Sequence, residues 1–220
     1  MPIITIRGQL GSGAPEVGKR IASRLGADYV DREIIAEVAA RLHREEQEVI
    51  AKEMPPSSLL GRIAEALEHG YAFGDALAGA YLPLGQIPLD DLRYLQGLES
   101  VIKDLARSPR LVIFGRGSEF ILKDHPGSLH VLIVAPLDVR VKRIMESQKL
   151  DQAAAKSEIT RFDNSIIKFL KRYFKAEFED PVFYDLVINT ERISFEDAAS
   201  IAIEALSIKN QSLTKQGKTG

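Results

Sequence analysis

The first 26 residues constrain the fold more than any other part of the chain. An apolar run from Ile3 to Ile6 leads into a glycine-rich turn, Gly8 to Gly13, and a helical pattern follows from Glu16 to Leu25. Glycines let backbone N–H groups face an anion, and the N-terminus of the following helix adds the positive end of its dipole. This arrangement predicts a phosphate-binding loop and points to nucleotide chemistry.

One part that such loops usually carry is missing. A lysine commonly follows the last glycine of the turn, and here that position holds Ala14. The string from Gly13 to Lys19 matches G-x-x-x-x-G-K, but that register puts its second glycine and its lysine a full turn inside the predicted helix. The anion turn must directly follow the strand, so we place the loop at Gly8 to Gly13. Ser12 within it either donates to a phosphate or caps the helix.

Composition narrows the class of protein. The 220 residues suffice for a sizeable core, and 45% hydrophobic and 27% charged residues are ordinary for a globular protein. A net charge of −2 gives no reason to expect nucleic-acid binding. Without cysteine, and with four scattered histidines, we expect no metal site. No apolar stretch is long enough to span a bilayer, and no signal-peptide pattern is present, so we expect a cytoplasmic protein without membrane partners.

Short β-rich runs alternate with helical patterns, which is typical of a parallel sheet covered on both faces. We therefore expect an α/β fold with a doubly wound, five-stranded parallel sheet. The strands are predicted at 2–7, 27–30, 110–115, 128–134 and 185–189. The helices are predicted at 15–25, 32–42, 90–107, 117–123, 137–149, 152–174 and 195–207.

Residues 45–90 interrupt this alternation, because prolines and a run of small residues break the pattern. We interpret them as a helical insertion in a single domain of residues 1–208. The insertion either binds the acceptor substrate and closes over it, or forms a helical hairpin that packs against the core or a second copy of the chain. Residues 209–220 are polar and are predicted to form a disordered tail.

Five segments, in this order and spacing, resemble the cytidylate kinase-like family of P-loop proteins. They are Ile4–Gly13, Asp31-Arg32, Val112–Gly117, Val134–Arg143 and Tyr184–Thr190. The resemblance covers most of the chain outside 45–90 and the tail. It implies ATP-dependent phosphoryl transfer to a nucleoside monophosphate, with CMP preferred, and it implies ATP and Mg²⁺ as cofactors.

The resemblance also implies roles for individual residues. Gly8, Gly11, Ser12 and Gly13 would hold the donor phosphates. Arg116, after the third strand, would grip the acceptor phosphate, since a guanidinium can bind two phosphate oxygens at once. A surface ion pair is the alternative for this arginine.

Two further arginines, Arg140 and Arg143, share one helix face and resemble those that precede the kinase lid; a solvated basic face is the alternative. Asp31 and Arg32 match the pair that holds the monophosphate, at a strand end where α/β sheets place ligands. The segment Arg161-Phe162-Asp163 resembles the lid or the acceptor-base segment of the family, and we assign Asp163 to the acceptor site. Asp185 matches a base-contacting aspartate, with a strand-start cap as the alternative.

Two departures from the family pattern bear on catalysis. Ala14 removes the cation that usually bridges the β- and γ-phosphates, and Pro15-Glu16 stands where a Mg²⁺-holding serine or threonine is usual. Glu16 would also repel a triphosphate. The cations that could substitute are Lys19, Lys142 and Arg143.

Three hypotheses follow from these departures. The first is a nucleoside monophosphate kinase that acts on a CMP-like acceptor. The second is a catalytically impaired sensor that binds a nucleotide or another phosphorylated ligand. The third is a homo-oligomeric scaffold that binds no nucleotide and uses residues 54–90 as its interface.

Overall fold

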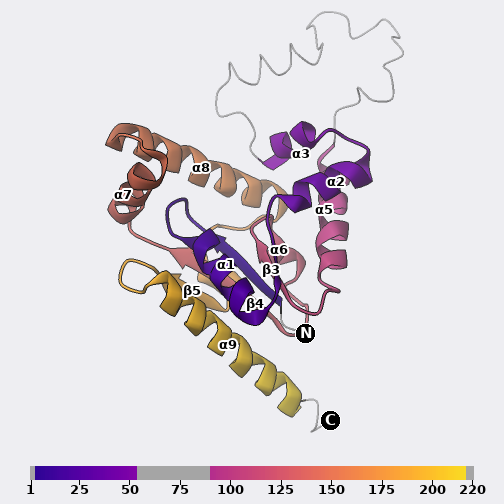
Figure 1. The fold of residues 1–220 in the computed structure, drawn as a ribbon. Coiled ribbons are helices and arrows are strands. Elements are labelled where there is room, and N and C mark those ends of the chain that lie inside the picture. The colour runs from indigo at the N-terminus through magenta and orange to yellow at the C-terminus, as the bar shows by residue number, and fades with distance from the viewer. Residues whose placement is uncertain (1–2, 54–89, 217–220) are drawn as a thin grey trace, which may run out of the picture.

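The computed structural model describes residues 3–53 and 90–216 and contains a five-stranded sheet (Figure 1). The strands are β1 (Ile3–Gly8), β2 (Asp28–Val30), β3 (Leu111–Phe114), β4 (Ser128–Val134) and β5 (Leu186–Asn189). Their order is β2-β3-β1-β4-β5, and every neighbouring pair is parallel. All carboxyl ends therefore lie along one edge of the sheet, with β1 at its centre.

Helices connect and cover these strands. They are α1 (Ala14–Leu25), α2 (Glu33–Leu42), α3 (Glu46–Glu53), α5 (Asp91–Leu105), α6 (Ser118–Ile121), α7 (Leu137–Gln148), α8 (Gln152–Tyr173) and α9 (Phe195–Gln216), with a 3₁₀ turn at Pro181–Phe183. In Figure 1, α8 extends from α7 toward α3, and α8 contacts both of these helices. No described helix is long and apolar enough to cross a membrane.

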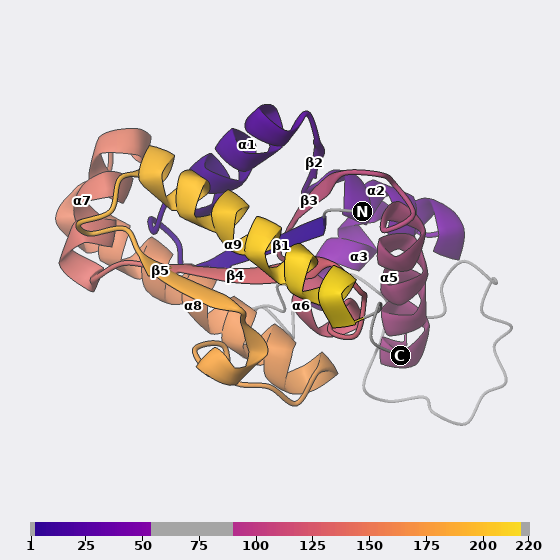
Figure 2. The same cartoon turned by 90° about the horizontal axis from the view of Figure 1, so that it is seen from below.

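Successive side chains of the buried strands point to opposite faces of the sheet, and they form one hydrophobic core on each face. Ile4 and Ile6 of β1 pack with α1 and α9 on one face, and Ile3 packs with α2, α5 and α8 on the other. Figure 2 shows α1 and α9 together on one side of the sheet. The predicted doubly wound parallel sheet with helices on both faces is confirmed, and each of its five strands lies where the sequence placed it.

The C-terminal helix differs from expectation. Residues 209–220 were expected to be a disordered tail, but α9 continues to Gln216, so that boundary is wrong. The physical reason is a tertiary contact, since the Lys209 ammonium donates to both carboxylate oxygens of Asp185, at 2.7 and 2.6 Å. Of the insertion expected at 45–90, the first part contains α3, and residues 54–89 lie outside the described residues.

Candidate functional site

The glycine-rich loop adopts the conformation that a phosphate-binding turn requires. Gly11 and Gly13 have φ angles of 81° and 86°, and Gly13 caps α1, whose first residue is Ala14. The amides of Gly13 and Ala14 make no hydrogen bond within the described residues, as expected at a helix N-terminus. The buried Ser12 hydroxyl also has no partner there. The loop thus keeps free donors for an anion.

The other reading of the loop, with Gly18 and Lys19 as its end, does not fit. Both residues lie inside α1. A Cβ on Gly18 would lie 2.8 Å from the Tyr29 ring, and the Lys19 ammonium lies 5.9 Å from the centre of the same ring. Gly18 is therefore explained by the packing of α1 on β2 rather than by an anion.

Two side chains of the C-terminal half cover the loop. The Phe195 ring lies directly against Gly13, where any Cβ would overlap it, and the Arg143 guanidinium stacks 4.9 Å from the centre of this ring. Arg143 also donates to the carbonyl oxygens of Gly11 and Ser12, at 3.2 and 3.3 Å, and to Thr190. Arg143 thus lies at the loop, but its donors bind the protein's own acceptors.

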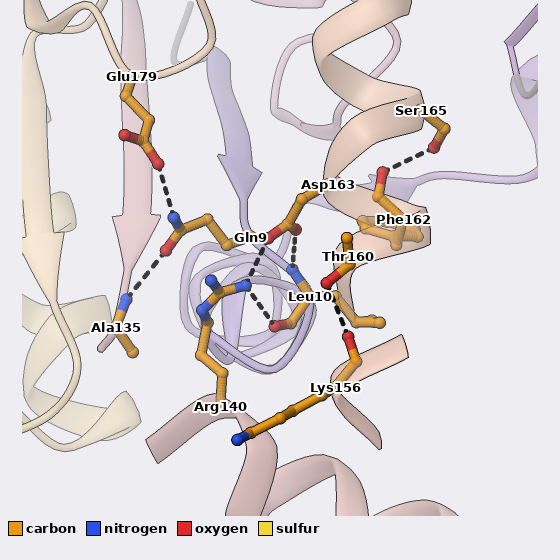
Figure 3. Close-up of polar contacts among 10 residues, drawn as sticks. All are labelled: Gln9, Leu10, Ala135, Arg140, Lys156, Thr160, Phe162, Asp163, Ser165 and Glu179. Carbon is orange, nitrogen blue, oxygen red and sulfur yellow. Dashed lines mark hydrogen bonds and ion pairs between the residues drawn. The ribbon is translucent and has the colours of Figure 1, made fainter. Parts of the chain in front are cut away.

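A second set of contacts holds the start of the loop (Figure 3). The Asp163 carboxylate accepts from the Leu10 amide at 3.2 Å and from Arg140 at 2.7 Å, while Arg140 donates to the Leu10 carbonyl at 3.3 Å. The Gln9 amide group accepts from the Ala135 backbone and donates to Glu179. Helices α7 and α8 thereby fix the loop's position relative to β4.

A cavity of about 500 Å³ opens at the carboxyl ends of β1 and β3, beside Gly8. Its lining combines charged groups near the strand ends with an apolar wall from α2, α3 and α8. The lining residues are Arg7, Gly8, Asp31, Arg32, Ile35, Glu46, Ile50, Glu53, Phe114, Gly115, Arg116, Phe162, Ser165, Ile166 and Phe169. Such a cavity suits a small anion with an apolar body.

Arg116 is the central cation of this cavity. Its guanidinium pairs with Glu53 and lies 3.5 Å from Asp31, and its φ of 60° is unusual for a residue other than glycine. Burial lowers the pKa of Arg116 and raises the pKa of Asp31, despite their mutual attraction. The Arg32 side chain makes no hydrogen bond or ion pair with any described residue, so its guanidinium donors are free.

The floor of the cavity is a buried ion pair. Arg7, the penultimate residue of β1, pairs with Glu119 of α6, and their side chains are 5% and 2% exposed. A buried charge of this kind requires its partner. Arg7 is therefore neutralised within the protein. Arg116 is paired with Asp31 and Glu53 but lines the cavity, and Arg32 is the lining cation whose side chain has no hydrogen-bond or ion-pair partner among the described residues.

Of the cavity residues that sequence reasoning missed, three come from a single helix, α3. Glu46, Ile50 and Glu53 lie on α3, inside the segment interpreted as an insertion. Glu53 is buried and also accepts from the Tyr94 hydroxyl at 3.1 Å. Their spacing of four and three residues, which puts them on one helix face, was a signal that could have found them.

The structure brings only some of the predicted site residues together. Asp31, Arg32 and Arg116 line the cavity beside Gly8. Asp163 was expected at the acceptor and instead contacts the loop, as do Arg140 and Arg143. Asp185 lies apart, at the start of β5, where it accepts from the His130 amide and binds Lys209.

Among the described residues, no protein-held Mg²⁺ site is formed. Pro15 has neither a side-chain oxygen nor an amide hydrogen, and within residues 3–53 and 90–216 no three histidine or acidic side chains gather to hold a metal. Of the carboxylates that line the cavity, Asp31 and Glu53 both pair with Arg116. Any Mg²⁺ would arrive bound to the phosphates of a nucleotide, which is how this ion usually enters such sites.

Comparison with known proteins agrees with this geometry. The model of the cytidylate kinase-like family matches residues 3–192. Cytidylate kinase of Sulfolobus acidocaldarius is 27% identical over 94% of this chain and 95% of its own, and that of Methanopyrus kandleri is 25% identical over 93% and 92%. An uncharacterised protein of Eubacterium ventriosum superposes with a TM-score of 0.64 at 18% identity, over 94% of this chain and 99% of its own, which supports the fold alone.

Proposed function

The chain belongs to the cytidylate kinase-like family, and we propose that it transfers a phosphoryl group from ATP to a nucleoside monophosphate, with CMP preferred. One observation carries the proposal. Two arginines with different freedom, Arg32 and Arg116, line a cavity that begins at Gly8 of the phosphate loop. Donor and acceptor phosphates would therefore meet at the carboxyl end of β1.

The acceptor would bind with its phosphate at the arginines. Arg116 would contribute a guanidinium already aimed at the strand ends by Asp31 and Glu53, and Arg32 would add unpaired donors. The nucleoside would lie against the apolar wall formed by Ile50 and the α8 side chains. Glu46, which has no partner among the described residues, could accept a hydrogen bond from an exocyclic amino group such as that of cytosine.

The donor would bind at the loop. The amides of Gly13 and Ala14, the Ser12 hydroxyl and the N-terminus of α1 would hold its phosphates. An oxygen of the acceptor phosphate attacks the terminal phosphorus of ATP, and the bond to the bridging oxygen breaks to release ADP. Mg²⁺ supplies charge neutralisation as part of the MgATP substrate. The chain's residues contribute positioning and positive charge.

A second candidate function is supported by a specific observation. Arg140 and Arg143, which would have to neutralise charge during transfer, donate to Asp163, to Thr190 and to the loop's own carbonyl groups. Combined with Ala14, this favours a sensor that binds a nucleotide or phosphorylated ligand without turnover. Saturable binding of CMP or ATP with no ADP release would establish it.

The deciding experiment measures ADP release from MgATP against a panel of nucleoside monophosphates, with a control that lacks an acceptor. We expect release that depends on the acceptor and is fastest with CMP. Release without acceptor dependence would indicate simple ATP hydrolysis and would contradict the proposal. If the folded protein binds nucleotide but releases no ADP, the sensor hypothesis would replace the kinase hypothesis. If millimolar nucleotide leaves the melting temperature unchanged, the oligomeric scaffold would be favoured.

A further inference from the structure

Helix α8 contacts both halves of the proposed site within little more than one turn. Phe162, Ser165 and Ile166 line the acceptor cavity, whereas Asp163, between them in sequence, does not. Figure 3 shows Asp163 directed at Leu10 of the phosphate loop, away from the neighbouring Phe162. One rigid element therefore contacts the acceptor region with some side chains and the donor loop with another.

The contact between Asp163 and the loop is specific. One carboxylate oxygen accepts from the Leu10 amide at 3.2 Å, and the other accepts from Arg140 at 2.7 Å. Arg140 donates to the Leu10 carbonyl with the same nitrogen, so the three groups form a closed ring. The side chains of Asp163 and Arg140 are only 18% and 8% exposed, so water competes weakly for these bonds.

Packing reinforces the ring. The Leu10 side chain lies against the small apolar cluster that α7 and α8 share, which includes Val141, Ile144 and Ile159. A displacement of α8 would therefore move the loop's backbone through both an ion pair and an apolar contact. Interiors packed in this way transmit small shifts rather than absorb them.

From this arrangement we infer that Asp163 is a positioning residue that couples acceptor binding to donor binding, acting through Leu10 and Arg140. The inference rests on the proposed function, in which the cavity takes the acceptor and the loop takes the donor. A ligand that fills the cavity presses on Phe162 and Ile166, and α8 transfers that shift to the loop through Asp163. Coupling between two sites is reciprocal, so each ligand raises the affinity for the other by the same factor.

The test measures binding without turnover, by titration calorimetry with a non-hydrolysable ATP analogue and CMP. In the wild-type protein, we expect saturating CMP to raise the affinity for the analogue about fivefold or more, and the analogue to raise that for CMP equally. Asp163→Asn, which keeps the shape and loses the charge, should still bind each ligand but reduce the coupling factor to below about twofold. Glu158→Gln is the matched control, since Glu158 lies on the same helix and pairs only with exposed Arg161.

If Asp163 only holds the loop in place and does not couple the two sites, the measurement gives a different result. In that case Asp163→Asn would lower the affinity for the ATP analogue by the same factor with and without CMP. The unchanged coupling factor would overturn the inference. Should this variant fail to fold, Arg140→Lys tests the same ring, because a lysine side chain is one bond shorter and its ammonium does not reach the position of the Arg140 nitrogen that donates to both Asp163 and the Leu10 carbonyl. An unchanged coupling factor in Arg140→Lys would then also overturn it.

The outcome also separates this inference from the proposed function. A wild-type protein that turns over CMP without coupling the two ligands would overturn the inference and leave the function intact. Coupled binding without ADP release would do the reverse. If neither ligand bound the folded wild-type protein, both would be wrong.

Discussion

Two clusters of polar groups differ in how completely their groups are paired. One lies in the middle of the sheet, on β1 and β4, and the other lies at the carboxyl edge, after β1 and β3. In the middle of the sheet, His130 accepts or donates hydrogen bonds with Thr5 at 2.8 Å and Ser128 at 3.1 Å, and its backbone amide binds Asp185. At the carboxyl edge, Arg116 is flanked by two carboxylates, and the Ser12 hydroxyl is buried without a partner among the described residues.

The difference teaches where ligand chemistry can occur. Groups that satisfy one another, as around His130, have nothing left to offer a ligand and serve to specify the sheet's packing. At the carboxyl edge, by contrast, the Ser12 hydroxyl and the Arg32 side chain have no hydrogen-bond or ion-pair partner among the described residues and keep donors that a phosphate can engage. Asp185 belongs to the cluster around His130, although the family resemblance had suggested that it contacts the base of the acceptor. Variants at four residues test this comparison.

The largest expected effect is on activity at the carboxyl edge. Arg116→Ala should lower kcat/KM for the acceptor by about a thousandfold, or about 4 kcal/mol, because it removes the cation proposed to hold the acceptor phosphate. Steady-state kinetics with CMP as the variable substrate, beside a melting curve, measures it. Arg107→Ala is the control, because Arg107 is 83% exposed and pairs only with Asp104.

Removing Arg116 also leaves Glu53 buried without its cation, which could impair folding. Arg116→Lys keeps the charge but loses the two-pronged geometry, and it should still lower kcat/KM at least tenfold, about 1.4 kcal/mol. Undiminished turnover in either folded variant would refute the role of Arg116.

The next effect concerns stability beneath the cavity. Glu119→Gln should lower the free energy of unfolding by about 3 kcal/mol, because the buried Arg7 would lose its compensating charge. Urea denaturation gives this value directly. Glu99→Gln removes an exposed carboxylate that pairs with Lys103 and should change stability by less than about 0.5 kcal/mol. If both variants changed the free energy of unfolding equally, the ion pair between Arg7 and Glu119 would contribute no more to stability than an exposed pair.

The third effect is a pH dependence that arises in the middle of the sheet. Burial lowers the pKa of His130 from 6.5 to about 4, so the unfolded chain binds the proton more readily than the folded one. Stability from this group is therefore present above pH 6.5 and is lost as the pH falls toward 4. The loss between pH 7 and pH 5 should be about 2 kcal/mol.

His130→Gln removes this titration while keeping polar atoms for Thr5 and Ser128. Denaturation curves of the wild type and the variant at both pH values give the comparison. The difference between the two proteins should shrink at pH 5, where the wild type has lost its advantage. A difference that is independent of pH would show that His130 does not carry the titration.

The smallest effect separates Asp185 from the site. Asp185→Asn should cost less than about 1 kcal/mol of stability, because its ion pair with Lys209 is partly exposed, at 30% and 35%. The KM for CMP and the kcat should stay unchanged, since Asp185 does not line the cavity. A large rise in the KM for CMP, measured in the same assay as Arg116→Ala, would return Asp185 to the acceptor site.

The sequence alone determined the order of strands and helices along the chain and the place of the glycine-rich loop. These features follow from local patterns: the apolar run of β1, the positive φ angles that favour glycine at Gly11 and Gly13, and the helical period of α1. It also placed Arg116 at the end of β3, because a strand end can be read from where the apolar run stops. Family resemblance added the chemistry to these positions.

Tertiary structure alone decided the partners of the charged side chains. Arg7 meets Glu119, Leu10 meets Asp163, and Arg143 meets Thr190 across long stretches of chain, and no local pattern encodes such pairs. A helix period fixes which face a residue occupies but not which distant element packs against that face. Asp163 therefore contacts the loop rather than the acceptor cavity because the packing of α8 on α7 turns its face that way.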